Sequence, residues 1–322
     1  MKTAIITGVG GQDGSYLSEY LLGLGYKVVG LVRRHSVSET QTYRLNHILE
    51  HPNFHLEYGD VTDYSSMFRI ITKHTPDEIY NLAAQSHVKV SFDVPLYTAD
   101  VTGIGLLNIL EILRSSQELS KIRVYQASSS EMFGNNIDDD GYQRETTPLS
   151  PVSPYGCSKV FAHNIARNYR NSYGLFVSSG ILFNHESERR GLNFVTAKVA
   201  KGAADIFNKK IDTLQLGNLD ATRDWGHAKD YVRAMHLIIN NEQADEFVCA
   251  TGVNTSVREL CNVAFSYLGL NWEYFVKSNS KYFRPEELHH LKGDASKLHK
   301  TFDFELEYDF KKLIHEMVDY YV

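Results

Sequence analysis

The sequence predicts an α/β protein with a doubly wound parallel sheet. In the first half of the 322-residue chain, short β-branched runs alternate with longer helical patterns. A run of glycines follows the first β-branched run, and hydrophobic residues make up 43% of the chain, enough for a large core. Strands that alternate with helices form βαβ units, and such units build a parallel sheet that is covered on both faces.

The elements of this sheet can be placed in order along the chain. The predicted strands are residues 3–7, 27–32, 54–58, 78–84, 123–128 and 175–183. Helices are predicted at 15–24, 64–74 and 97–115, the last from apolar residues near helical spacing. A further helix has serines in its cap region, Pro154 in its first turn and Gly174 at its end.

The regular alternation ends near residue 182. Beyond it, helices are predicted at 194–208, 228–240, 257–268 and 310–321, with short strands at 245–250 and 272–276. We therefore predict a first domain of residues 1–182 and a smaller mixed α/β lobe of residues 183–322, with some crossing of the chain between them.

Charge and cysteine content exclude several classes of protein. The net charge is −6 with no block of like charges, so we expect no nucleic-acid partner. The three cysteines are widely spaced, which favours a reducing, cytoplasmic compartment. No signal peptide or run of membrane-spanning length is apparent, so we expect no membrane association. The fourteen histidines lack the spacing of zinc sites, and we expect no metal.

The stretch ITGVGGQDGSYL has the spacing of a dinucleotide-binding turn. Gly8, Gly11 and Gly14 follow the first strand and open a helix, so backbone N–H groups can approach a diphosphate closely. An ordinary glycine-rich turn is the alternative, but the position within a βαβ pattern favours the cofactor site. The sequence thus predicts a Rossmann-type sheet, with the C-terminal lobe binding the substrate.

The second strand ends in two arginines. A site selective for NAD normally carries an acidic residue here, whereas Arg33 and Arg34 suit the 2′-phosphate of NADP. A solvated arginine pair is the alternative. Asp60 ends another strand and can accept a hydrogen bond from the adenine amino group.

Tyr155 and Lys159 are four residues apart on a predicted helix and so share a face. An ammonium beside a phenol lowers the phenol pKa, so that Tyr155 can act as base or acid nearer neutral pH. With a serine hydroxyl from a neighbouring strand end, the pair would form a hydride-transfer site. Such a pair often lies on a protein surface without a catalytic role, but its position downstream of a dinucleotide turn favours a catalytic role here.

The Y-x-x-x-K motif after the glycine turn resembles the extended short-chain dehydrogenase/reductase family. Longer stretches, among them NLAAQSHVKVSF, GILFNHESERRGLNFVTAKV and GNLDATRDWGHAKDYV, resemble the GDP-mannose 4,6-dehydratases. They extend over nearly the whole chain. Glu188 and Thr222 depart from the residues that are usual in that family.

The resemblance implies a hydro-lyase that converts GDP-mannose to GDP-4-dehydro-6-deoxy-mannose, on the route to GDP-fucose and other deoxysugars. Hydride would pass from carbon 4 to NADP while Tyr155 takes the hydroxyl proton, helped by Ser129. Glu131 would then remove the carbon 5 proton and protonate the departing hydroxyl at carbon 6, before hydride returns to carbon 6. The catalytic set is therefore Ser129, Glu131, Tyr155 and Lys159.

The residues and the resemblance together give two sets of expected contacts. The cofactor set is Gly8, Gly11, Gln12, Asp13, Gly14, Arg33, Arg34, Asp60, Val61, Leu82, Ala83, Gln85, Ser86, Tyr97, Tyr155, Lys159, His185 and Arg190. The substrate set is Ser86, Ser129, Glu131, Tyr155, Asn184, Lys198, Arg223 and Arg284.

Three other functions remain open at this point. A reductase of the 4-keto sugar needs the tyrosine and lysine but not Glu131, a nucleotide-sugar epimerase is a more distant enzyme, and a regulator that senses NADP typically lacks Y-x-x-x-K. The family is also oligomeric, which implies a homodimer or homotetramer in which residues 34–42 reach a neighbour's cofactor.

Overall fold

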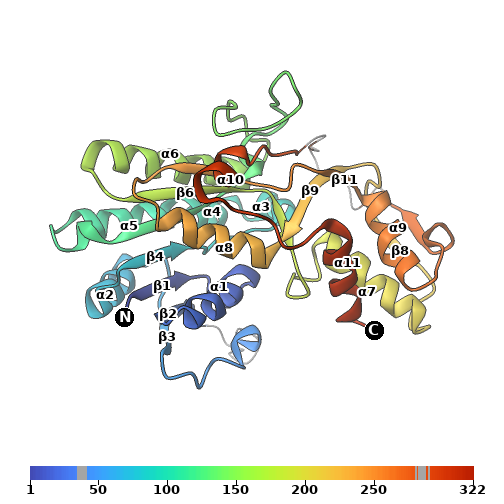
Figure 1. The fold of residues 1–322 in the computed structure, drawn as a ribbon, viewed down its shortest axis with the longest axis horizontal. Coiled ribbons are helices and arrows are strands. Elements are labelled where there is room, and N and C mark those ends of the chain that lie inside the picture. The colour runs from blue at the N-terminus through green and yellow to red at the C-terminus, as the bar shows by residue number, and fades with distance from the viewer. Residues whose placement is uncertain (35–41, 280, 282–287, 289–290) are drawn as a thin grey trace.

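The computed structural model describes residues 1–34, 42–279, 281, 288 and 291–322 (Figure 1). Within these residues, a seven-stranded sheet has the order β10-β6-β5-β4-β1-β2-β3, and every neighbouring pair is parallel. Its strands are β1 (Thr3–Thr7), β2 (Lys27–Val32), β3 (Phe54–Tyr58), β4 (Glu78–Asn81), β5 (Arg123–Ser129), β6 (Val177–Leu182) and β10 (Glu246–Cys249). The predicted parallel sheet is confirmed.

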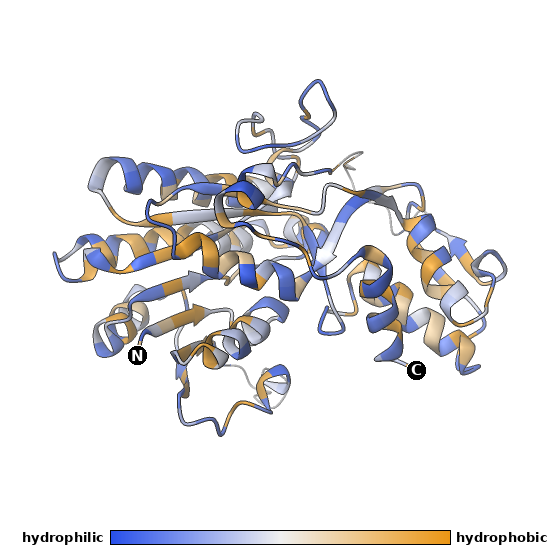
Figure 2. Cartoon of the chain, viewed as in Figure 1, coloured by the Kyte–Doolittle hydropathy of each residue, from blue (hydrophilic) through white to orange (hydrophobic). Residues whose placement is uncertain are grey.

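Helices cover both faces of this sheet. They are α1 (Gln12–Gly23), α2 (Tyr64–His74), α3 (Val88–Asp93), α4 (Pro95–Ala99), α5 (Gly105–Arg114), α6 (Pro154–Tyr173), α8 (Ala228–Ile239) and α10 (Ser296–Phe302). Apolar side chains of α1 and α8 form one core cluster with the sheet, and those of α2, α5 and α6 form another. Figure 2 shows hydrophobic residues concentrated on the strands and on helix surfaces within this layered unit.

The helix predicted at 97–115 is a helical run from Pro95 to Arg114 that contains a π-helical segment, Asp100–Ile104. This 20-residue run is long and apolar enough to cross a membrane, so the expectation that no run reaches that length was wrong. The run is apolar because it contributes to the core of the fold and not because it spans a membrane. Its buried residues, among them Leu106, Ile109 and Leu110, belong to the core that α5 shares with α6.

The second part of the chain forms a smaller unit at the right of Figure 1. It contains α7 (Val195–Phe207), α9 (Val257–Tyr267), α11 (Phe310–Asp319), the paired strands β8 (Leu214–Leu216) and β12 (Val276–Ser278), and the sheet of β7 (Asn184–Glu186), β9 (Thr222–His227) and β11 (Asn254–Ser256). Between β9 and β11 the chain returns to the large sheet as α8 and β10. The strand predicted at 272–276 was misplaced, because Trp272–Tyr274 form a 3₁₀ turn and β12 begins at Val276.

Helix α6 begins in direct contact with the segment that follows β5. As predicted, Pro154 lies in its first turn and Gly174 ends it with φ of 68°; the Ser153 side chain accepts a hydrogen bond from the N–H of Gly156. A Cβ on Gly156 would lie 2.8 Å from the carbonyl oxygen of Glu131 and 2.9 Å from Cβ of Pro151. Only glycine therefore lets the helix start this close to residue 131.

We expect Gly156→Ala to lower the free energy of unfolding by ~1–3 kcal/mol, since the added methyl group collides with backbone that cannot move away cheaply. Urea unfolding measures the change. Gly23→Ala is the matched control, because a Cβ there meets nothing within 4 Å and alanine in a helix is favoured over glycine by ~1 kcal/mol. Equal stability of the two variants would contradict the close approach.

Candidate active site

A cavity of about 920 Å³ lies at the carboxyl ends of the strands of the large sheet. Its walls include the residues that follow β1, β2, β4, β5 and β6. The strand order reverses between β1 and β4, and ligands of open parallel sheets bind at such a point. The volume is at the upper end of the ~300–1,000 Å³ range of small-molecule sites.

The glycine turn between β1 and α1 forms one wall of this cavity. Gly8 has φ of 69°, and a Cβ on it would lie 3.0 Å from the backbone nitrogen of Ala83. A Cβ on Gly14 would lie 2.5 Å from the carbonyl oxygen of Gly8. No side chain caps the N-terminus of α1. Its first N–H groups are therefore available to an anion such as a diphosphate.

Most of the residues predicted to bind the cofactor line this cavity. They are Gly8, Gly11, Gln12, Asp13, Gly14, Arg33, Asp60, Val61, Leu82, Ala83, Ser86, Tyr97, Tyr155, Lys159, His185 and Arg190. Arg34 and Gln85 are not among the lining residues. Gln85 instead donates to the carbonyl of His87 and to Thr98, which orders the segment that follows β4. The segment 35–41, predicted to reach a neighbour's cofactor, lies outside the described residues.

Of the two arginines at the end of β2, Arg33 points to the cavity. It donates a hydrogen bond to the Tyr97 hydroxyl, and its guanidinium lies 5.6 Å from the centre of the Tyr97 ring. Both residues line the cavity. The structure thus gives the two predicted arginines different environments.

The four predicted catalytic residues meet in one wall of the cavity. Strand β5 ends at Ser129, and Ser130–Met132 form a 3₁₀ turn in which the Ser129 hydroxyl accepts a hydrogen bond from the N–H of Glu131. Strand alternation would place Ser129 and Glu131 on one side and Ser130 on the other, but the strand has already ended at Ser129. All three residues line the cavity.

Burial dominates the proton affinities of Tyr155 and Lys159. It raises the pKa of Tyr155 to about 12, although a hydrogen bond with Ser129 opposes part of the rise. Burial also lowers the pKa of Lys159 to about 8, partly offset by the charge of Asp13. Lys159 donates to the carbonyl of Ala127 at 2.6 Å, and its nitrogen lies 5.7 Å from the Tyr155 ring centre. Burial therefore raises the phenol pKa, whereas the sequence predicted that Lys159 would lower it, and the effects that oppose burial are the hydrogen bond with Ser129 and the charge of Arg190.

Residues predicted to bind the substrate enter the same cavity from the smaller unit. Asn184, Lys198 and Arg223 line it, and Arg223 donates to the carbonyl oxygens of Thr222 and Leu288. Arg284 lies outside the described residues.

Two further cations in the cavity wall were missed by the sequence analysis. Arg44 donates to the carbonyl oxygens of Gly10 and Arg189, and Lys89 donates to the carbonyl of Lys281. Lys89 lies in the stretch NLAAQSHVKVSF, but no contact was assigned to it there, and Arg44 lies in none of the stretches that carry the resemblance. Only the folded chain brings them to the cofactor turn and the substrate side.

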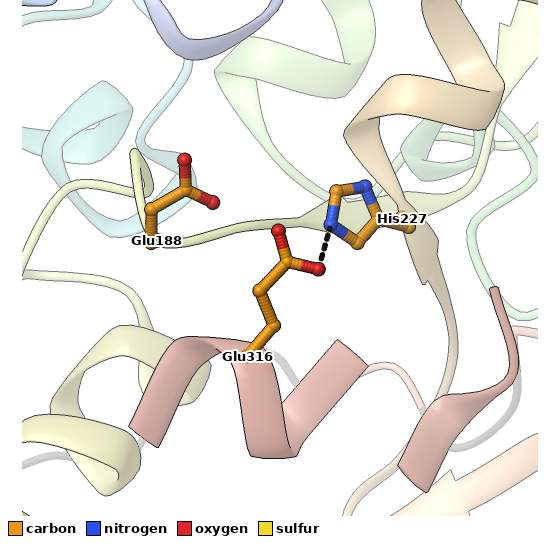
Figure 3. A group of neighbouring side chains, drawn as sticks. All are labelled: Glu188, His227 and Glu316. Carbon is orange, nitrogen blue, oxygen red and sulfur yellow. Dashed lines mark ion pairs between the residues drawn. The ribbon is translucent and has the colours of Figure 1, made fainter. Parts of the chain in front are cut away.

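One cluster of potential metal ligands, Glu188, His227 and Glu316, was also missed (Figure 3). Nε2 of His227 lies 3.4 Å from an Oε atom of Glu316. However, Nδ1 of His227 accepts the N–H of Lys229, and burial lowers the pKa of His227 to about 3. A neutral ring with an accepting Nδ1 carries its proton on Nε2 and offers no lone pair to an ion there. The ring therefore presents an N–H to the carboxylates rather than a metal ligand.

Comparisons with known proteins show the family of the chain. The family model described as GDP-mannose 4,6 dehydratase matches residues 5–317. GDP-mannose 4,6 dehydratase 2 of Arabidopsis thaliana is 50% identical over 99% of this chain and 86% of its own length. GDP-mannose 4,6 dehydratase of Cricetulus griseus is 45% identical over 98% of this chain and 90% of its own length.

Among solved structures, dTDP-glucose 4,6-dehydratase from Bacillus anthracis in complex with NAD matches with a TM-score of 0.85 and 22% identity. It covers 100% of this chain and 96% of that chain. A likeness at this identity shows the shared fold alone. The family model and the two relatives span nearly the whole chain, and the chain therefore belongs to the GDP-mannose 4,6 dehydratase family.

Proposed function

We propose that the chain removes water from GDP-mannose to give GDP-4-dehydro-6-deoxy-mannose, with NADP as a cofactor that is regenerated in each cycle. The observation that carries this proposal is the meeting of Ser129, Glu131, Tyr155 and Lys159 with the glycine turn in one cavity. Membership of the family supplies the substrate and the reaction.

The residues present fit a dinucleotide. The glycine turn leaves backbone N–H groups at the start of α1 for the diphosphate, and Arg33 lies at the edge of the cavity for the 2′-phosphate. When bound, NADP supplies a hydride acceptor for carbon 4 and a hydride donor for carbon 6. Lys159, Tyr97, His185 and Arg190 complete the wall that would hold it.

Tyr155 is the base for the hydroxyl on carbon 4. Ser129 orients the phenol through their hydrogen bond. Because burial holds the Tyr155 pKa at about 12, the phenolate needs a positive charge nearby, and Lys159 supplies one when protonated. The proton that Tyr155 takes from the hydroxyl balances the proton that carbon 5 regains at the end of the cycle.

Glu131 moves the second proton. The ketone at carbon 4 acidifies the hydrogen on carbon 5, and the Glu131 carboxylate removes it. The same group then protonates the hydroxyl on carbon 6, which leaves as water. Glu131 is buried in the cavity wall, where bulk water does not compete for that proton. Its backbone is fixed by Ser129 and by the close approach of Gly156.

The proposal also assigns a role to each of the two parts of the chain. Residues 1–182 would bind the cofactor and carry the catalytic set, and residues 183–322 would bind the GDP-sugar, with α8 and β10 returning to the large sheet. The protein would act as a homodimer or homotetramer in the cytoplasm. Of the described residues assigned to GDP-mannose, Asn184, Lys198 and Arg223 belong to residues 183–322, and the others belong to residues 1–182, namely Ser86, Ser129, Glu131 and Tyr155.

Purified protein incubated with GDP-mannose is expected to give a product lighter by one water, with no net reduction of added NADP, because the hydride returns to the same sugar. Mass spectrometry and absorbance at the NADPH band measure the two quantities. An unchanged GDP-mannose together with oxidation of NADPH by the 4-keto sugar would instead identify the reductase.

We expect Glu131→Gln to reduce turnover by ~10²–10⁴-fold, since the amide can neither remove nor deliver the proton. NADP binding should be retained, because Glu131 is assigned to the sugar. The measurements are product formation by mass spectrometry and NADP binding by calorimetry. Glu118→Gln, at an exposed position, is the matched control. Turnover near that of the control would remove Glu131 from the mechanism.

The choice of NADP over NAD is expected to depend on Arg33. Arg33→Ala should weaken NADP binding by ~10–100-fold, the loss of a hydrogen bond to a charged group, while NAD binding changes little. Arg34→Ala is the comparison, because Arg34 is not among the residues lining the cavity. Calorimetric titration of both dinucleotides tests the prediction. Equal losses for NAD and NADP in Arg33→Ala would contradict it.

A further inference from the structure

A buried ion pair joins the glycine turn to strand β7. Asp13 lies in the first turn of α1, and its Oδ2 is 2.8 Å from Nε2 of His185. The other ring nitrogen, Nδ1, is 2.7 Å from the carbonyl oxygen of Phe183. The His185 ring is buried and stacks on Tyr231, with ring centres 4.5 Å apart.

The hydrogen bonds of His185 determine its protonation. A carbonyl oxygen and a carboxylate oxygen are acceptors only, whereas a neutral imidazole has a single N–H to donate. Two contacts of hydrogen-bond length to two acceptors therefore require a proton on both ring nitrogens. Burial by itself would lower the pKa of His185, but the charge and hydrogen bond of Asp13 outweigh burial and raise it.

Both carboxylate oxygens of Asp13 already have partners within the protein. Oδ2 faces His185, and Oδ1 accepts a hydrogen bond from Nε2 of Gln12 at 2.9 Å. The positive charge of His185 outweighs the effect of burial and lowers the pKa of Asp13 to about 2, so the carboxylate stays ionised. An acid in a turn that must bind a diphosphate would otherwise repel it.

We propose that Asp13 is a positioning residue, which holds His185 as a fixed imidazolium in the cavity wall and does not itself contact the cofactor. This inference rests on the proposed NADP site. It changes the role expected of Asp13 from ligand to counter-ion, and it gives the cavity a cation at neutral pH in addition to its lysines and arginines.

The pair is part of a larger contact between the two units. Gln12 donates to the carbonyl of His185 at 3.0 Å and accepts from the hydroxyl of Ser187 at 2.8 Å. Strand β7 also carries Asn184, which lines the cavity on the substrate side. The contact therefore fixes the substrate strand against the turn that binds the cofactor.

Several other charged or titratable groups act on the pair. Arg190, in the loop after β7, lowers the pKa of both members. The charge of Asp13 acts to raise the pKa of Lys159 and of Tyr155 on α6. The charge of His185 acts to lower the pKa of His227 at the end of β9. The pKa of His185 is raised and that of Asp13 is lowered to about 2, so the ion pair is lost as the pH rises through the raised His185 pKa or falls through about 2, and it is complete between these limits.

The direct test is the protonation of His185 in the intact protein. In ¹⁵N-histidine-labelled protein at pH 7, both ring nitrogens of His185 are expected to carry protons, with the signal assigned by its loss in His185→Gln. Asp13→Asn should leave a proton on one nitrogen only, because an amide still forms the hydrogen bond but supplies no charge. A singly protonated ring in the unmodified protein would overturn the proposal.

The functional test is NADP affinity after removal of bound cofactor. At pH 7, Asp13→Asn removes both charges of the pair and leaves the net charge of the cavity unchanged. NADP binding should still weaken by about tenfold, because the proposal places the imidazolium, and not the carboxylate, against the cofactor. Asp140→Asn, which removes an exposed partner of Arg144, is the matched control and should leave affinity unchanged. Unchanged affinity in a folded Asp13→Asn would refute the positioning role.

These measurements separate the inference from the proposed function. The protonation of His185 is read without substrate or turnover. If the His185 ring is doubly protonated but the protein does not dehydrate GDP-mannose, the ion pair is supported and the proposed reaction is refuted.

Discussion

The close approach of backbone to backbone at the carboxyl edge of the large sheet is the constraint on which the site depends. The ends of β1 and β4 are tied by Thr7, whose hydroxyl donates to Asn81 and accepts the N–H groups of Leu82 and Ala83. Asn81 in turn donates to Gln126 in β5. These bonds fix the ends of β1 and β4 and join them to β5, and the cavity lies at the carboxyl ends of these strands.

The glycine turn and the start of α6 approach their neighbours at this edge so closely that only glycine fits at the points of contact. Gly8 lies against Ala83 on one side of the cavity, and Gly156 lies against residue 131 on the other. The first contact shapes the turn that would bind the diphosphate. The second brings the start of α6, and with it Tyr155, beside Glu131. In both contacts, backbone atoms fill the space that a Cβ would need.

Buried charges in the site are held by partners from distant parts of the chain. His185 is paired with Asp13 across the two units, and Lys159 is held by a carbonyl of β5. Helix α6 is fixed at its far end as well, because Glu246 at the start of β10 forms ion pairs with Arg167 and Arg170. The return of the chain from the smaller unit to the large sheet therefore supports the helix that carries Tyr155.

The sequence by itself determined the layered α/β fold, the glycine turn and the Tyr155 and Lys159 pair, because these follow from local periodicity, turn chemistry and fixed spacing along one helix. Only the tertiary structure decided where β5 ends, so that Glu131 faces the cavity through a 3₁₀ turn rather than strand alternation. It also separated Arg33 from Arg34, added Arg44 and Lys89, and joined Asp13 to His185. These contacts unite residues up to 192 positions apart, and no local pattern in a single sequence encodes which distant groups will share a buried space.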